Sequence, residues 1–256
     1  MNIISYGGGV QSTALIVLAA QGKIEATHAV FANTGDDSEH PATLEYVRNV
    51  AAPWAAEHGV EVVEVSRKQT LLENVTGDGR SVNIPIYMEG GAPGNRNCTA
   101  EWKIKVIERW LRQQGATVST PATVHIGISM DEIHRLNNRR PSKLQEPTYP
   151  LIDLRLHRQD CMNIIAAAGL PVPPKSSCWF CPFKRKAQWQ EMRRDEPELF
   201  ARAIALEERI NEKRAGLGKD NVYLSTWLKP LSEVTEAQQD LWSVMDDSCD
   251  SGYCMV

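Results

Sequence analysis

The side chains best suited to chemistry are two cysteines that stand two residues apart. Cys178 and Cys181 lie in the sequence Ser-Cys-Trp-Phe-Cys-Pro, and two thiolates at this spacing can bind one metal centre from a tight turn. A proline directly after the second cysteine recurs at iron–sulfur ligands. A zinc ribbon needs a second such pair, which the sequence lacks. A thioredoxin-like dithiol stands at a helix start after a strand, whereas a proline-rich connector precedes this pair. The pattern favours an iron–sulfur centre, with zinc and a metal-free site as alternatives.

Cys98 and Cys161 are the natural remaining ligands, because a [4Fe–4S] cluster needs four cysteines. We therefore expect Cys98, Cys161, Cys178 and Cys181 to converge on one metal centre. For Cys161 the rival interpretation is a small buried hydrophobic residue on a helix, where free cysteines are common.

Two more cysteines, Cys249 and Cys254, lie on an acidic C-terminal tail. A free chain end that carries a thiol beside Gly252 is suited to reaching into an active site, so Cys254 and Cys249 are the candidate catalytic nucleophiles. The neighbouring aspartates would raise the pKa of such a thiol. A disordered acidic tail is the competing interpretation.

A glycine-rich loop joins the first apolar run to the first helical pattern. Its glycines allow backbone N–H groups to point at an anion, and a helix start adds its dipole. The loop matches neither the Walker A pattern nor Gly-x-Gly-x-x-Gly, and a tight strand-to-helix turn is the alternative. We expect it to bind nucleotide phosphate through Ser5, Gly7, Gly8, Gly9, Gln11, Ser12 and Thr13.

The elements that must position these residues alternate between strand and helix. Such alternation is typical of α/β proteins in which helices cover both faces of a parallel sheet. We expect an α/β nucleotide-binding domain at residues 1–135 and a helical extension at 136–256, which carries metal-cluster cysteines and the acidic tail. Strands are predicted at residues 2–6, 27–33, 60–65 and 122–128, and helices at 11–21, 42–58, 99–115, 158–169 and 186–213.

Two polar segments follow predicted strands, at the sheet edge where ligands of such folds bind. We expect the segment after the fourth strand to line the nucleotide pocket, with a carboxylate that positions Mg²⁺ or holds ribose hydroxyls. For the acids of the second segment, an ordinary helix start is the alternative. The candidates are Asn33, Thr34, Gly35 and Asp36 after the second strand and Gly127, Asp131, Glu132 and Arg135 after the fourth.

The glycine loop resembles the PP-loop of the N-type ATP pyrophosphatases and of the sulfonucleotide (APS/PAPS) reductases. Residues 7–12 align with the family pattern Ser-Gly-Gly-x-Asp-Ser. Gly7 replaces the first serine, Gln11 replaces the aspartate, and Val10 stands where a lysine is frequent. Residues 33–43 look like the family's Thr-Gly segment, which lies near the adenine and ribose. Residues 96–103 and 127–135 resemble further family motifs, and residues 96–103 are also similar to DNA-phosphorothioation proteins. The resemblance implies an adenine nucleotide alpha hydrolase-like (HUP) fold, ATP or a sulfonucleotide (APS or PAPS) as ligand, and a [4Fe–4S] cluster with Cys98 among its ligands.

This resemblance is compatible with three functions. An ATP-dependent sulfur-transfer (thiolation) enzyme would adenylate a nucleic-acid or related acceptor, with a sulfur-donor protein such as a cysteine desulfurase as partner. An APS/PAPS reductase would release sulfite, with Cys254 or Cys249 as its nucleophile. A degenerate nucleotide- and cluster-binding module is the third. We favour sulfur transfer, because this tail does not match the reductases' Glu-Cys-Gly-Leu-His ending.

Composition predicts a soluble, cytoplasmic protein without a membrane partner. The longest apolar stretch near the N-terminus, residues 14–20, is far shorter than the roughly 18 residues that a membrane span needs. A chain of 256 residues has an ample core and does not need disulfides, so its six cysteines indicate a reducing compartment. The net charge of −4 argues against a protein coated with nucleic acid but is compatible with a local basic groove.

Overall fold

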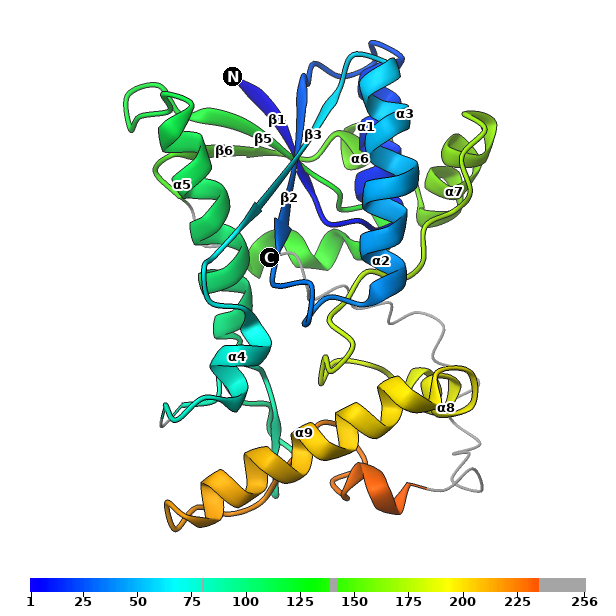
Figure 1. The fold of residues 1–256 in the computed structure, drawn as a ribbon. Coiled ribbons are helices and arrows are strands. Elements are labelled where there is room, and N and C mark those ends of the chain that lie inside the picture. The colour runs from blue at the N-terminus through cyan, green and yellow to red at the C-terminus, as the bar shows by residue number, and fades with distance from the viewer. Residues whose placement is uncertain (80, 139–141, 235–256) are drawn as a thin grey trace.

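A parallel five-stranded sheet forms the centre of the fold (Figure 1). The computed structural model describes residues 1–79, 81–138 and 142–234. All neighbouring strands of the sheet are parallel, since helical segments connect each strand to the next. This confirms the expected α/β class. The strands are β1 (Asn2–Tyr6), β2 (His28–Asn33), β3 (Glu61–Ser66), β5 (Ala122–Ile126) and β6 (Gln145–Thr148), in the spatial order β3-β2-β1-β5-β6.

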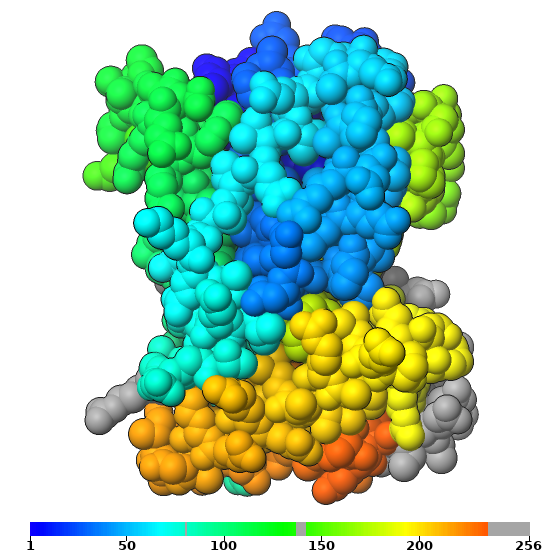
Figure 2. All heavy atoms as spheres, viewed as in Figure 1, coloured from blue at the N-terminus to red at the C-terminus, as the bar shows by residue number. Residues whose placement is uncertain are grey.

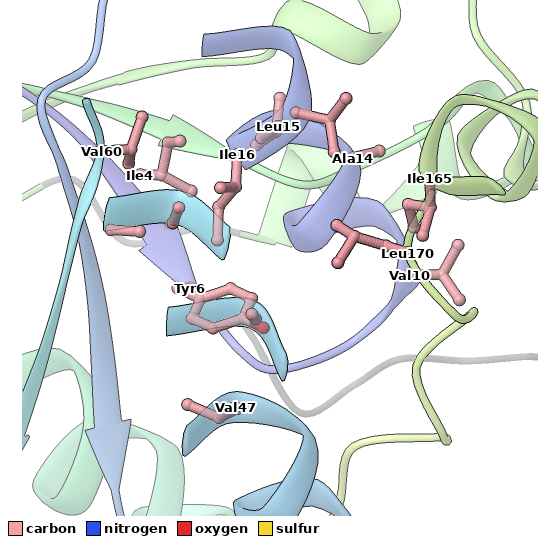
Figure 3. Packing of buried hydrophobic residues seen from close by; sticks show 14 of the residues in the cluster. Ile4, Tyr6, Val10, Ala14, Leu15, Ile16, Val47, Val60, Ile165 and Leu170 are labelled. Carbon is pink, nitrogen blue, oxygen red and sulfur yellow. The ribbon is translucent and has the colours of Figure 1, made fainter. Parts of the chain in front are cut away.

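Helices cover both faces of this sheet. On one face, Ile4 and Tyr6 of β1 belong to the same buried cluster as Ile16 (Figure 3). Ile3 faces the opposite layer, where it shares a cluster with Leu111, as the two-residue period of a strand requires. The first face is covered by α1 (Val10–Ala20) and the continuous segment α2 (Pro41–Tyr46), η1 (Val47–Ala51) and α3 (Ala52–Glu57), and the second by η2 (Thr99–Ile104) and α5 (Lys105–Gln113).

The sheet layer continues past residue 135, where the sequence suggested a domain boundary. Strand β6 extends the sheet beside β5, and α7 (Arg158–Ala167) packs against α1 through Ile165. The sequence of β6 has no apolar alternation, and its Pro147 is tolerated because β6 is an edge strand. In the chain, η3 (Met130–Asn138) lies between β5 and β6, and α6 (Pro150–Asp153) lies between β6 and α7.

A second layer lies below the sheet (Figure 1) and contains α8 (Lys186–Asp195) and α9 (Pro197–Ala215). The sequence predicted one helix here, but Pro197 cannot continue the hydrogen bonds of α8 and starts a new helix instead. Smaller elements complete the layer: α4 (Leu71–Thr76), the antiparallel pair β4 (Tyr87–Met88) and β7 (Val222–Tyr223), and η4 (Leu231–Glu233).

The two halves of the chain share the core of this lower layer. Trp189 and Phe200 from the C-terminal half lie in one buried cluster with Leu71 and Trp102 from the N-terminal half. In the space-filling view, the segment coloured cyan runs from the sheet down onto the lower layer (Figure 2). Within the described parts of the chain, no helix is both long and apolar enough to cross a lipid bilayer.

Candidate functional site

The order of strands in the sheet marks where a ligand is expected. Strands β2 and β3 lie on one side of β1, and β5 and β6 lie on the other. Ligands of open parallel sheets bind beyond the carboxyl ends of the strands at such a switch point. The glycine loop leaves β1 at this point, and Gly127 follows β5. The two segments predicted to bind nucleotide are therefore neighbours in space.

The glycine loop is held in shape by its own groups. The N–H of Gly7 donates to Ser12 Oγ at 3.2 Å, and the Ser12 hydroxyl donates to the carbonyl of Gly9 at 3.1 Å. Gly8 has a φ of +73°, and a Cβ at this position would lie 2.9 Å from Thr43 Cγ2 of α2. Gly8 is thus required by backbone conformation and close packing, while Ser12 closes the loop from inside.

The start of α1 lies directly against the end of β5. A Cβ on Gly127 would lie 2.9 Å from the backbone nitrogen of Ser12, so only glycine permits this approach. The Gln11 side chain donates to Glu132 Oε2 at 3.3 Å and accepts from Arg158 at 3.3 Å. The start of α1 therefore contacts Gly127 directly after β5, Glu132 of η3 and Arg158 of α7.

A buried ion pair of Glu132 and Arg135 lies beside Gln11. Arg135 Nη1 is 2.7 Å from Glu132 Oε2, and the two side chains are 5% and 8% exposed. The Nε and Nη2 groups of Arg135 are buried and have no hydrogen-bond partner within the described chain. These two groups form one edge of the guanidinium, and such an edge fits two oxygens of a phosphate, sulfate or carboxylate.

Asp131 holds the start of α7. It accepts the N–H of Arg158 at 2.6 Å, the Ser129 hydroxyl at 3.2 Å, and a contact from His157 Nδ1 at 3.0 Å. Partial burial raises the pKa of Asp131, but these hydrogen bonds outweigh burial and hold the pKa below its usual value. Its oxygens are thus engaged with a neighbouring helix.

Asn33 and Asp36 belong to a charged network at the end of β2. Arg48 Nη2 lies 2.6 Å from both Asp36 Oδ1 and Glu64 Oε1, and the Asn33 amide donates to the same two carboxylates at 2.7 Å. The Arg48 guanidinium holds the pKa of Asp36 below its usual range. Neither Asn33 nor Asp36 lines the two pockets described next.

The first pocket, called the loop pocket here, lies between the sheet and the helical segment of η2 and α5. Ser5 and Gly7 from the predicted nucleotide site contribute to its wall, together with residues that the sequence did not single out. Its lining residues are Ser5, Tyr6, Gly7, Ala32, Thr99, Lys103, Ile104, Ile107, Ile126 and Gln145.

The second pocket, called the thiol pocket, lies beside the first. Thr99 and Lys103 on η2 line both pockets. Three of the four expected metal ligands, Cys98, Cys178 and Cys181, surround this one hollow. Its lining residues are Thr34, Leu71, Ile84, Pro85, Arg96, Cys98, Thr99, Lys103, Cys178, Phe180, Cys181, Pro182 and Phe183.

The turn that carries Cys178 and Cys181 is hydrogen-bonded to the loop after β2. Backbone N–H groups donate in both directions, from His40 to Ser177 at 3.1 Å and from Trp179 to Ser38 at 3.2 Å. The Trp179 indole N–H donates to the carbonyl of Asp37 at 2.6 Å. This pairing brings two segments that are far apart in the sequence, residues 37–40 and 177–179, together at the carboxyl end of β2.

Polar and cationic groups surround the thiols. The Thr34 hydroxyl donates to Glu39 at 2.9 Å and lies 3.5 Å from Cys178 Sγ. Lys103 Nζ is 3.9 Å from the carboxylate of Glu39, which is 2% exposed. Burial lowers the pKa of Lys184, and the thiols of Cys181 and Cys178 act in the opposite direction. Lys103 and Arg96 place basic side chains on the wall of the thiol pocket.

Cys161 lies elsewhere, in the buried core between α1 and α7, and it does not line the thiol pocket. Its exposure is 0%, and burial raises the pKa of its thiol to about 12. Among the described residues, no group of three His, Cys, Asp or Glu side chains is arranged to hold a metal ion. The structure thus gathers three of the four expected ligands, while Cys249 and Cys254 lie outside the described residues.

The sequence predicted some wall residues and missed others. Cys98 and Lys103 stand in the segment that carries the family resemblance, which was the available signal for Lys103. Gln145 belongs to no motif and reaches the loop pocket only because β6 joins the sheet. Comparison with protein-family models and with curated proteins finds no match to this chain.

Proposed function

We propose that this protein is an enzyme of nucleotide-dependent sulfur transfer, built on an adenine nucleotide alpha hydrolase-like (HUP) sheet. The observation that carries the proposal is the shared wall of the two pockets, to which Thr99 and Lys103 both contribute. A nucleotide at the glycine loop and a sulfur atom at the thiols would then meet across one helical turn. Sulfur transfer requires such a meeting, because activation by ATP and attack by sulfur occur on the same carbonyl group of the acceptor, the first at its oxygen and the second at its carbon.

The loop pocket suits a nucleotide for electrostatic reasons. Helix α1 has 11 residues, so the dipole at its N-terminus favours an anion there. Lys103 lies on the wall of the pocket, and Arg135, which does not line the pocket, offers its unpaired edge next to Gln11 at the start of α1. These groups supply positive charge where phosphates would lie.

The thiol pocket suits an iron–sulfur cluster better than a single zinc ion. A zinc ion holds thiolate sulfurs at about 2.3 Å, so its ligands must converge closely, and the described side chains form no such group. A [4Fe–4S] cluster is larger and accepts thiolates set around a hollow, as Cys98, Cys178 and Cys181 are. With Cys98, Cys178 and Cys181 as its ligands among the described residues, a bound cluster would have one iron left for a further sulfur ligand.

The reaction has two balanced steps. An acceptor carbonyl oxygen attacks the α-phosphorus of ATP, and pyrophosphate leaves. Sulfide then attacks the activated carbon, and AMP departs with the original oxygen. The loop N–H groups and Arg135 would hold the phosphates, while Lys103, oriented by buried Glu39, would face the negative charge that develops.

A sulfonucleotide reductase is the second candidate. The observation that favours it is that the carboxylates near the glycine loop are engaged by other side chains, whereas ATP chemistry commonly uses them to hold Mg²⁺. The cysteines that would act as nucleophile, Cys254 and Cys249, lie outside the described residues.

Two product assays test these proposals on anaerobically purified protein. Pyrophosphate release from ATP, in the presence of sulfide and a mixed nucleic-acid acceptor pool, supports sulfur transfer. Sulfite release from labelled adenosine 5′-phosphosulfate supports the reductase instead. If neither product forms, the protein is a nucleotide- and cluster-binding module without catalytic activity. Lys103→Met should abolish turnover, whereas Lys105→Met, two residues further along and exposed beside Glu101, should not. Equal activity of the two variants would contradict the shared-wall argument.

A further inference from the structure

The carboxylates near the glycine loop do not fit the Mg²⁺ ion that the PP-loop resemblance implies. Mg²⁺ takes carboxylate oxygens as ligands and demands near-octahedral geometry around itself. Among the described residues, four acidic side chains that follow β2 and β5 are instead bonded to protein N–H or O–H groups, and a metal would have to displace them. The engaged pairs are Asp36 with Arg48 and Asn33, Asp131 with His157 and the N–H of Arg158, Glu132 with Arg135 and Gln11, and Glu39 with Thr34.

Gln11, in the first turn of α1, is a second feature that does not fit a Mg²⁺ site. The resembled pattern has an aspartate here, but the Gln11 amide is neutral and bridges two charged groups. Its nitrogen donates to Glu132 and its oxygen accepts from Arg158. Position 11, which holds an acidic residue in the resembled pattern, therefore carries a neutral amide that links the Glu132 carboxylate to the Arg158 guanidinium.

Arg135 carries the complementary observation. Its Nη1 group and the Gln11 amide both bind Glu132 Oε2, which places the guanidinium next to the start of α1. The remaining edge, Nε with Nη2, is buried without a hydrogen-bond partner in the described chain. Two parallel buried donors left unbonded are costly, and a tetrahedral oxyanion would satisfy both at once.

We propose that the site binds its nucleotide without a divalent metal, and that Arg135 holds one phosphate or sulfate group of that nucleotide by its Nε–Nη2 edge. The inference rests on the proposed nucleotide binding at the glycine loop. It assigns the neutralisation of phosphate charge to Arg135 and Lys103 rather than to Mg²⁺. The ligand class is an adenine nucleotide with a compact terminal oxyanion, bound as the metal-free species.

Calorimetric titration with ATP and with adenosine 5′-phosphosulfate tests the metal requirement directly. Each titration is run in EDTA and again with excess MgCl₂. We expect dissociation constants that agree within about twofold between the two buffers. Binding that weakens about tenfold or more in EDTA would overturn this inference and leave nucleotide binding intact. Absence of binding in both buffers would overturn the proposed function as well.

Variants test the role of Arg135. Arg135→Lys keeps a positive charge against Glu132 but loses the two-donor edge, so we expect affinity to fall about tenfold or more, in either buffer. Arg112→Lys on the exposed face of α5 is the matched control and should leave affinity unchanged. If Arg135→Lys lowers the melting temperature, the double variant Glu132→Gln/Arg135→Gln removes both buried charges at similar size and should show the same loss. Unchanged affinity in a folded Arg135 variant would overturn the assignment.

Discussion

Replacing Cys161 by alanine separates its role in the core from the ligand role that the sequence assigned to it. The thiol is fully buried, so alanine removes one sulfur atom and leaves a small cavity between α1 and α7. Such a truncation costs about 1–2 kcal/mol of unfolding free energy. For a chain of this size, that corresponds to a melting temperature lower by roughly 5 °C.

Cys161 is not expected to bind the metal, because it lies in the core with α1 and does not line the thiol pocket, and burial also disfavours its thiolate form. A thiol must lose its proton to become a ligand, and burial raises the pKa of this one from 9.0 to about 12. Each pKa unit is worth about 1.4 kcal/mol, so forming this thiolate costs about 4 kcal/mol more than forming an ordinary one. No such burial surrounds Cys98, which is only partly buried.

The assay compares Cys161→Ala with Cys98→Ala after anaerobic reconstitution with iron and sulfide. Iron per chain and the visible iron–sulfur absorption report the metal, and urea denaturation reports stability. We expect Cys161→Ala to keep its iron and lose stability, and Cys98→Ala to lose its iron. Complete loss of iron from Cys161→Ala, with its unfolding free energy unchanged, would refute the reasoning.

Two further predictions concern the carboxyl edge of the sheet. Gly127→Ala places a Cβ 2.9 Å from the Ser12 nitrogen, so thermal denaturation should show a loss of about 1–3 kcal/mol and titration should show weaker nucleotide binding; unchanged values would mean that β5 and α1 separate without cost. Arg48→Met removes the group that holds the pKa values of Asp36 and Glu64 low. A carboxyl group whose pKa is lowered in the folded state stabilises the protein above the pKa of the unfolded state, near pH 4. This stabilisation is lost as the pH falls through the pKa of the folded state. Urea denaturation should therefore show that the variant loses less unfolding free energy on acidification than the unmodified protein. The difference should stay below about 1 kcal/mol, because these groups are partly exposed, and a steeper acid loss in the variant would contradict the network.

Local patterns were sufficient for four of the five strands of the central sheet. The first strand, expected at residues 2–6, coincides with β1 (Asn2–Tyr6), and the helix expected at residues 11–21 is α1 (Val10–Ala20). The short elements were missed for a physical reason. Strand β6 is an edge strand with little apolar character, and α4 (Leu71–Thr76) has six residues, so neither carries a period long enough to recognise.

The candidate site was less predictable, because pairing partners decide what each residue can do. Asp36 and Glu132 have the charge of metal ligands, but Arg48 and Arg135 occupy them. Cys161 has the chemistry of a ligand, yet α7 buries it against α1. Residue type and spacing show which side chains could bind a metal or a nucleotide. Whether a side chain is free to do so depends on its contacts with distant parts of the chain.

The thiol pocket is built by protein contacts that need no metal. Backbone hydrogen bonds fix the Cys178 turn to the loop after β2, and Cys98 donates its N–H to the carbonyl of Asn83 at 2.8 Å. Both segments also rest on the core that joins the two halves of the chain. A chain with such a core differs from a zinc finger, in which metal binding supplies the folding free energy. A metal or cluster that binds a preformed hollow adds only its binding free energy to the stability of an already folded chain. The metal-free protein should therefore stay folded, with Cys178 Sγ 3.5 Å from the Thr34 hydroxyl at the carboxyl end of β2.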